Sequence, residues 1–471
     1  MALKTQFSRR QFTVITAATG MGAFIPTTTP VFAASPTSIL WTGVNFIQDC
    51  GTGNEVNCEA IDRIFPYLSP SFKDPEKGKF LYYGLPGKWG AAIGKSRQHK
   101  LVWMDGENAK EGDDVFQTDL AMMLGITSDR YIASTHYPSR GPGQGKTFMV
   151  YELQSYLLVV DVKGFEIVQS YPIRILGIDV VKGDSSPSKL KEDLQKFQWR
   201  SLSGRADGKP RVPGELQGLI SSLDFNNLKR ANVRVTKVLT TKRTKTWINK
   251  EHPQPKVDTK TKDLDFKFLL GNSATTAISE KFGIGIQPFT PNASLGLMVE
   301  DFAMARGEDT MGEQKLLNTG KIDLDVRLTA KAVVFKNQKK KGYQKTFLKK
   351  CTIVVQIEAG RYKRTYDESG QTEQNATLIG KPILKQMLLG VTQEETTGDF
   401  SNDWYWAVDL HQRLLDWFFS AIAENKDLSN LTKGQRNRLK AREYLTRVYT
   451  KDFAKFEAEA NAFKKALLTE R

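Results

Sequence analysis

FMVYELQSYLLVVDV (148–162) and FEIVQSYPIRILGI (165–178) are two long apolar runs separated only by Lys163 and Gly164. Both runs are rich in Val, Ile, Leu, Phe and Tyr, which fit the pleated surface of a sheet. A glycine in so short a connection is typical of a tight turn between paired strands. The two runs therefore predict a β-hairpin.

A second hairpin is predicted further along the chain. LTAKAVVF (328–335) and KTFLKKCTIVVQIE (345–358) read as its strands, and the lysine-rich residues 336–344 would form its tip. Cys351 lies within the second apolar run, so we expect a buried small residue there and not a nucleophile.

Shorter patterns predict further elements. ILWTGVNF (39–46) reads as a strand, and residues 59–68 as a short helix. DVFQTDLAMML (114–124) suits a helix stopped by Gly125. ANVRVTKVLTTKRTKTWI (231–248) alternates enough to form a strand or a hairpin with a basic face.

The C-terminal segment predicts a helical hairpin. WYWAVDLHQRLLDWFFSAIAEN (404–425) carries aromatic and aliphatic residues at helical spacing, with His411 at the edge of a core. A second helix is predicted after Thr432, as far as Leu468. Its apolar residues recur at steps of four and three: Tyr449, Phe453, Phe456, Ala460, Phe463 and Leu467. We expect this seam to dock on the body of the same chain; the alternative is a homodimer seam.

The chain is too long for one ordinary core, and Pro, Gly and Ser mark its breaks. The predicted fold is α+β, with two β-rich mixed domains and a C-terminal helical hairpin. We expect the chain to be divided into a signal peptide (1–34), an N-terminal α+β domain (35–182), a linker (183–214), a second β-rich domain with basic loops (215–400) and the helical hairpin (401–471). Residues 250–262 form a further break.

The first residues are organised as an export signal. The stretch Ser8-Arg9-Arg10-Gln11-Phe12 closely resembles the twin-arginine consensus, and a weakly apolar run rich in Ala, Gly and Thr follows it. Cleavage is expected after Ala33 or Ala34. The expected partner is thus the twin-arginine translocase, and the expected location is the periplasm or the exterior of a bacterium.

An oxidising compartment changes how two cysteines are interpreted. Cys50 and Cys58 are close in sequence, with Gly51 and Gly53 between them, so we expect them to close a small disulfide loop.

The net charge of +16 is concentrated in three segments. Eleven Lys or Arg residues against two acidic ones lie in 226–262, seven lysines and no acidic residue in 336–350, and eight basic residues against two acidic ones in 426–451. Clustered charge attracts anions, although lysine-rich loops also keep ordinary proteins soluble. The candidate anion-binding residues are Lys339, Lys340, Lys341, Lys345, Arg436, Lys440 and Arg447, with Lys433 and Lys451 on the same expected helix face as the last three.

Motifs for local chemistry are scarce. GPGQGKT (141–147) has Arg140 where a phosphate-binding P-loop needs glycine, and a strand pattern follows it, so nucleotide binding is not expected. No metal-binding motif is found. His136, beside that glycine loop, is the histidine best placed for function. Asp323 with Asp325 and Asp263 with Asp265 are acidic pairs on expected strands, where a step of two puts both on one face.

The sequence thus predicts an exported protein that binds or assembles with an anionic envelope component, such as an acidic polysaccharide, lipopolysaccharide or lipid head groups. The alternative is a periplasmic hydrolase or other enzyme whose site is built from distant residues, with His136, Asp323 and Asp325 as candidates. The sequence names neither a reaction nor a cofactor.

Overall fold

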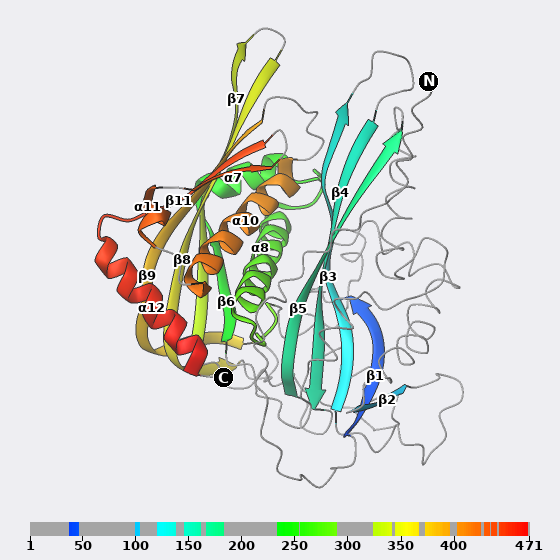
Figure 1. Ribbon diagram of the computed structural model, residues 1–471. Helices are drawn as coiled ribbons and strands as arrows, with labels where there is room; N and C mark the ends of the chain where they lie inside the picture. Colours follow the sequence, from blue (N-terminus) through cyan, green and yellow to red (C-terminus); the bar gives the residue numbers. More distant parts are fainter. Residues whose placement is uncertain are drawn as a thin grey trace, which may run out of the picture.

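Two β-sheets with helices packed between them form the molecule (Figure 1). The computed structural model describes residues 37–46, 99–103, 120–137, 146–161, 166–182, 233–253, 255–289, 324–341, 344–366, 373–395, 403–424, 428–433, 435–439 and 442–469, with side chains for only part of the strands. The expected α+β class, with two β-rich parts and a C-terminal helix pair, is confirmed.

The first sheet has five strands in the order β2-β1-β3-β4-β5. Their bounds are β1 (Thr37–Phe46), β2 (His99–Trp103), β3 (Leu120–Tyr137), β4 (Lys146–Asp161) and β5 (Glu166–Lys182). β4 and β5 are antiparallel, which confirms the first predicted hairpin. The strand predicted at 39–46 is confirmed as β1. The helix predicted at 114–124 is wrong over 120–124, because those residues pair with both β1 and β4 as part of β3.

The second sheet has six strands in the order β10-β11-β9-β8-β7-β6. They are β6 (Val233–Thr240), β7 (Leu324–Lys341), β8 (Gln344–Tyr366), β9 (Glu373–Glu395), β10 (Gln435–Leu439) and β11 (Arg442–Tyr449). The second predicted hairpin is confirmed as β7 and β8. Its lysine-rich residues are not a loop for most of their length, since the pairing continues to Lys341 opposite Gln344.

The two sheets share a topology. In each, one strand runs parallel to the first strand of a three-stranded antiparallel meander: β1 beside β3-β4-β5, and β6 beside β7-β8-β9. A parallel neighbour needs a crossover connection. Between β6 and β7 that connection contains two helices, α7 (Lys242–Glu251) and α8 (Thr259–Phe282).

The expectation for 231–248 is therefore only half confirmed. Residues 233–240 form a strand, but KRTKTWINKE forms α7. Thr241 begins this helix, since its side-chain oxygen accepts a hydrogen bond from the Thr244 N–H at 3.4 Å.

The C-terminal helices are α10 (Asp403–Ala423), α11 (Ser429–Lys433) and α12 (Phe453–Thr469). The aromatic helix predicted at 404–425 is confirmed as α10. The start predicted for the second helix is wrong, because residues 435–449 form the β10–β11 hairpin and extend the six-stranded sheet along β9. Of the basic residues expected on one face of that helix, Lys433 lies on α11, Arg436 on β10 and Arg447 on β11. Lys451 lies between β11 and α12, and Lys440 is outside the described residues.

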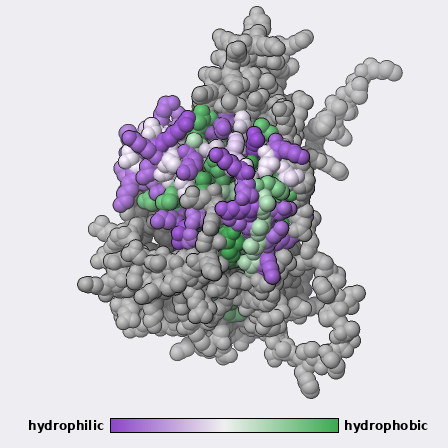
Figure 2. Space-filling view, turned by 90° about the vertical axis from the view of Figure 1, so that its left-hand side faces the viewer, coloured by the Kyte–Doolittle hydropathy of each residue, from purple (hydrophilic) through white to green (hydrophobic). Residues whose placement is uncertain are grey.

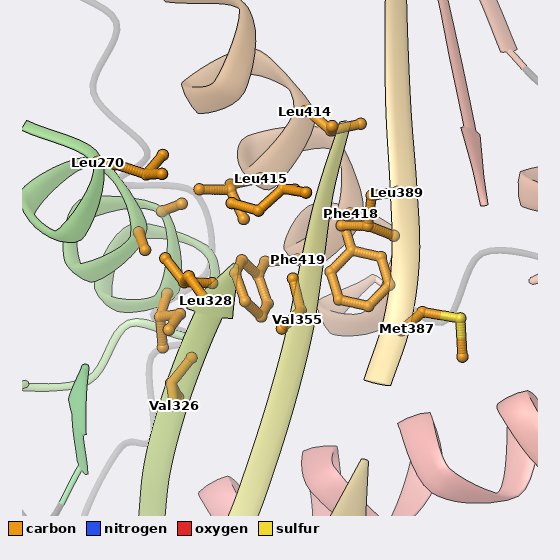
Figure 3. Close-up of a cluster of buried hydrophobic side chains, with 14 of the residues drawn as sticks. Leu270, Val326, Leu328, Val355, Met387, Leu389, Leu414, Leu415, Phe418 and Phe419 are labelled. Atoms are coloured by element: carbon orange, nitrogen blue, oxygen red, sulfur yellow. The ribbon is translucent and has the colours of Figure 1, made fainter. Parts of the chain in front are cut away.

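A continuous apolar core lies between the six-stranded sheet and α7, α8, α10 and α12 (Figure 3). Phe418 and Phe419 of α10 project from the helix side, and Leu328, Val355 and Leu389 come from three neighbouring strands. The predicted docking of α12 on the same chain is confirmed, since Phe456, Ala460, Phe463 and Leu467 are buried in this core. His411 lies fully inside the core and not at its edge.

α8 was not predicted, although it is the longest described helix. It is capped by Asp258 at its start and ends at Gly283, whose φ of 61° is left-handed. Asp263 and Asp265 lie on this helix, so the expected strand pair is wrong. On a helix a step of two points side chains in different directions: Asp263 binds Lys267 (2.7 Å), whereas Asp265 binds His252 (3.2 Å).

Two further findings concern the described residues alone. None of the described helices is both long and apolar enough to cross a membrane. Cys351 is fully buried, as predicted, and burial raises the pKa of its thiol well above the ordinary range.

Candidate functional site

The six-stranded sheet has one face covered by helices and one face turned outward. Along β8 the side chains alternate: Cys351, Ile353 and Val355 point into the core, whereas Lys350 and Thr352 lie on the opposite face and are partly exposed. β11 alternates in the same way, with Val448 buried and Arg447 and Tyr449 exposed. Cationic and aromatic side chains from distant parts of the chain therefore share the outer face.

Tyr449 is the centre of this surface. It is 39% exposed, and its ring lies against Gly390 of the neighbouring strand β9. A Cβ atom at Gly390 would come within 2.7 Å of the ring, so a glycine is needed for the tyrosine to lie in this place. Thr352 of β8 is paired with Gly390 across the strands, and its methyl group would lie 3.4 Å from a Cβ atom at that glycine.

Two cations flank this ring. Lys350 Nζ lies 5.7 Å and Arg447 Cζ 5.5 Å from the ring centroid, both within the range of a cation–π contact. The guanidinium of Arg447 is also held by α11, because its Nε donates to the Thr432 carbonyl oxygen at 2.8 Å. We refer to Lys350, Thr352, Gly390, Arg447 and Tyr449 as the outer cationic site.

The chemistry of the outer cationic site follows from its parts. Two positive charges on one exposed surface attract an anion, and the nearby ring offers a flat apolar contact. The arrangement therefore suits binding of a group with an anionic and an apolar side.

The space-filling view looks at the side of the molecule that carries α12 and the edge of the six-stranded sheet (Figure 2). Hydrophilic residues cover most of the described surface in this view, around a narrower band of hydrophobic ones. The described part of this side is therefore mainly hydrophilic.

The candidate anion-binding residues are only partly brought together. Lys340 and Lys345 are cross-strand neighbours near the end of the β7–β8 hairpin, and Lys339 and Lys341 lie beside them in β7, although their side chains are outside the described part. Arg436 lies in β10, paired with Leu445, and Lys440 falls outside the described residues. Arg447 alone is placed in the outer cationic site.

The sequence missed Lys350 and Tyr449 as members of a site. In the sequence Lys350 is one lysine among the seven of residues 336–350, and the apolar spacing predicts Tyr449 as the first residue of a helical seam. No spacing links β8, β9 and β11, because their contact is created by strand pairing across a hundred residues.

A second polar cluster is buried between the five-stranded sheet and the helices. Arg174 of β5 binds Glu152 of β4, and across the layer it binds Asp416 of α10 at 3.3 Å, with Asp409 at 3.9 Å. Burial tends to lower the pKa of Arg174, but these three carboxylates outweigh it and the pKa is raised. Arg174 is thus held as a cation.

Two carboxyl groups in this cluster have unusual proton affinities. Burial, and next the charge of Asp416, raise the pKa of Glu280 to about 8, against the opposing effect of Arg174. Burial also raises the pKa of Asp416, again opposed by Arg174. Strongly shifted groups gather at functional sites, but also in structural ion networks.

The residues predicted as candidates for an enzyme site lie in different sheets or outside the described residues. His136 lies in β3 of the five-stranded sheet, and Asp325 in β7 of the six-stranded sheet; Asp323 is outside the described residues. Among the described residues no group of three His, Cys, Asp or Glu side chains is placed to hold a metal ion. His252 is engaged with Asp265 and packs against Trp404 (ring centroids 4.7 Å apart), inside the fold.

The export and disulfide predictions fall outside the described residues. This applies to Ser8, Arg9, Arg10 and Phe12, to the cleavage residues Ala33 and Ala34, and to Cys50 and Cys58.

The chain was compared with protein families, curated proteins and solved structures. No family model matches the chain, and no curated protein matches it. Among solved structures, a putative neuraminyllactose-binding hemagglutinin homolog from Helicobacter pylori matches 42% of this chain and 97% of its own, at 9% identity and a TM-score of 0.22. A score this low does not establish a shared fold.

Proposed function

We propose that the chain is an exported binding protein that holds an anionic glycan of the bacterial envelope on its outer cationic site. The observation that carries the proposal is that Lys350 of β8 and Arg447 of β11 both lie near the ring of an exposed Tyr449. A sugar bearing phosphate or carboxylate groups offers both partners that this site needs: a negative charge for the cations and a ring for the tyrosine.

The β7–β8 hairpin supports the same proposal. It carries Lys339, Lys340, Lys341 and Lys345 at its far end, and β8 continues from there to Lys350 of the outer cationic site. A polymeric anion would meet both positive regions along one strand. Contacts of this kind are individually weak and strongly screened by salt, so binding by several of them together is expected.

Binding to heparin and to purified lipopolysaccharide tests the proposal. The double variant Lys350→Ala with Arg447→Ala should weaken binding about five- to thirtyfold at low salt, because each exposed charge contributes on the order of 0.5–1 kcal/mol. Tyr449→Ala should weaken it without changing the salt dependence. The matched control, Lys242→Ala with Lys260→Ala, removes the same charge from helices α7 and α8.

Two results would count against the outer cationic site. If the control weakens binding as much as the site variant, only net charge matters. If anionic lipid vesicles without glycan bind as tightly as lipopolysaccharide, the ligand is a head group and not a sugar.

Export has its own test. Arg9→Lys with Arg10→Lys should leave the full-length chain in the cytoplasm, because the twin-arginine address is read by a receptor. Fractionation and mass spectrometry of the N-terminus measure this. An unprocessed wild-type protein in the cytosol would remove the envelope from the proposal.

A further inference from the structure

The two sides of the helix layer differ in character. Among the described residues, the apolar core comes from the stretch between Val233 and Leu467. The five-stranded sheet has buried apolar residues of its own, such as Met122 and Leu157, which do not belong to this core. On the other side, α8 packs against β5 and α10 against β3. We use the word junction for this second contact, between the five-stranded sheet and the helices α8 and α10.

Polar side chains meet at the junction. Gln154 Nε2 of β4 donates to Gln412 Oε1 of α10 at 3.1 Å, and the Tyr156 hydroxyl donates to Asn272 Oδ1 of α8 at 3.1 Å. Interfaces of this polar kind resemble transient contacts between domains more than a shared core. The chain between the two sides, residues 183–232, supplies fifty residues of connection.

Charge is concentrated at one place in the junction. Arg174 of β5 is surrounded by Glu152 of β4, by Asp409 and Asp416 of α10 and by Glu280 of α8, with Lys281 of α8 and Arg413 of α10 as further cations. Four carboxyl groups thus face three cations. If every carboxyl were ionised, the cluster would carry an uncompensated negative charge where Glu152 and Asp409 are fully buried and Glu280 is half-buried, which is costly.

A short segment after α8 spans the same junction. The Ile286 N–H donates to the Ser170 carbonyl oxygen of β5 at 3.0 Å, whereas the next amide, that of Gln287, donates to the Val233 carbonyl oxygen of β6 at 2.8 Å. Adjacent amides are therefore bonded to opposite sides. If the two sides separate, the first hydrogen bond breaks and the second remains.

We propose that the junction is a separable, proton-linked contact, which closes when the carboxyl group of Glu280 takes up a proton and opens when that proton is lost. Closing brings Glu280 beside Asp416 and Glu152, and a neutral carboxyl there leaves three carboxylates for three cations. Opening returns Glu280 to water, where its charge costs little.

The direction of the pH effect follows from the two states. Glu280 has a pKa of about 8 in the closed junction and an ordinary value of 4.5 in water. Closing therefore binds a proton between these two values, so low pH favours the closed state. Raising the pH through this window favours opening by at most about tenfold per pH unit, and the preference is fully lost above the higher value.

Hydrogen exchange at single-residue resolution tests the proposal in the full chain. After correction for the intrinsic pH dependence of exchange, the protection of the Ile286 amide should fall by roughly ten- to a hundredfold from pH 6 to pH 8. The Gln287 amide should keep its protection over the same range. In Glu280→Gln, which resembles the protonated side chain, Ile286 should stay protected at both pH values.

The control is Glu457→Gln on the exposed face of α12, which should behave as the wild type does. The proposal is overturned if Ile286 shows no pH dependence in the wild type, if Gln287 loses protection in parallel, or if the pH dependence persists in Glu280→Gln. Because the glutamine variant removes no atoms from the junction, loss of folding is not expected to obscure the result.

Discussion

At the residue scale, Gly271 shows how closely α8 is packed. A Cβ atom there would lie 2.1 Å from the ring of Phe289, a separation that real side chains do not adopt. Gly271→Ala should therefore lower the free energy of unfolding by about 2–3 kcal/mol, despite the better helix propensity of alanine. Denaturant unfolding measures this.

Phe289→Ala in the same chain provides the control for the Gly271 prediction. If the clash with Phe289 is the cause, the double variant should be less unstable than the sum of the two single variants. Additive effects would place the cause elsewhere in the helix.

His411 should make stability depend on pH. Burial lowers its pKa to about 4, against the opposing effect of hydrogen bonds with the backbone of Ala407 and Thr352. The folded state binds fewer protons than the unfolded one between about pH 6.5 and pH 4, so stability falls as the pH falls through this range, by about 3 kcal/mol in total.

His411→Asn isolates this contribution, because asparagine keeps a donor for Ala407 but does not titrate. Unfolding of both proteins between pH 7 and pH 4 should show a steeper loss in the wild type. Equal slopes would mean that His411 is not the group that takes up the proton.

Individual residues could be predicted from the sequence only where the signal is local. Cys351 was predicted as buried because the apolar run around it is a local signal. The outer cationic site was not predicted beyond Arg447, because Gly390 and Tyr449 acquire their roles only when β11 is paired with β9. A site made by side chains on three strands leaves no spacing to recognise.

At the element scale, α12 is part of the core and not an appendage. Phe463 is fully buried, with ring centroids 5.6 Å from Phe282 of α8 and 6.1 Å from Phe419 of α10. Phe463→Ala should cost about 3–5 kcal/mol of unfolding free energy. Asn461→Ala, on the exposed side of the same helix, should change it by less than about 0.5 kcal/mol.

Thermal or denaturant unfolding separates these two α12 variants. If Phe463→Ala melted no earlier than Asn461→Ala, the packing of α12 on its own chain would be in doubt.

Elements were predicted well where periodicity and burial agree. The β4–β5 and β7–β8 hairpins and α10 each have one pattern throughout. The sequence does not reveal α8, because the helix is buried on nearly all sides and its polar residues do not form the solvent-facing stripe of a surface helix. The alternation in DLDF (263–266) also imitates a strand. The β10–β11 hairpin was read as helix because its residues suit a helix locally, and the free edge of β9 decides otherwise.

At the scale of the whole molecule, the confinement of the apolar core to residues 233–467 has a direct consequence. A fragment of residues 233–471 should fold alone, with a cooperative thermal transition followed by circular dichroism. Its exposed α8 and α10 surface is polar, so it should stay in solution. A fragment without a cooperative transition would show that the five-stranded sheet is needed for the core to form.

The segment around Ile286 and Gln287 also bears on how the molecule avoids sticking to its copies. β5 and β6 end their sheets, and unpaired strand edges recruit strands from neighbouring molecules. One short stretch of backbone occupies part of both edges. A substitution that dislodges it would uncover two templates for self-association at once, and its first visible effect would be aggregation at a temperature where the rest of the fold is still intact.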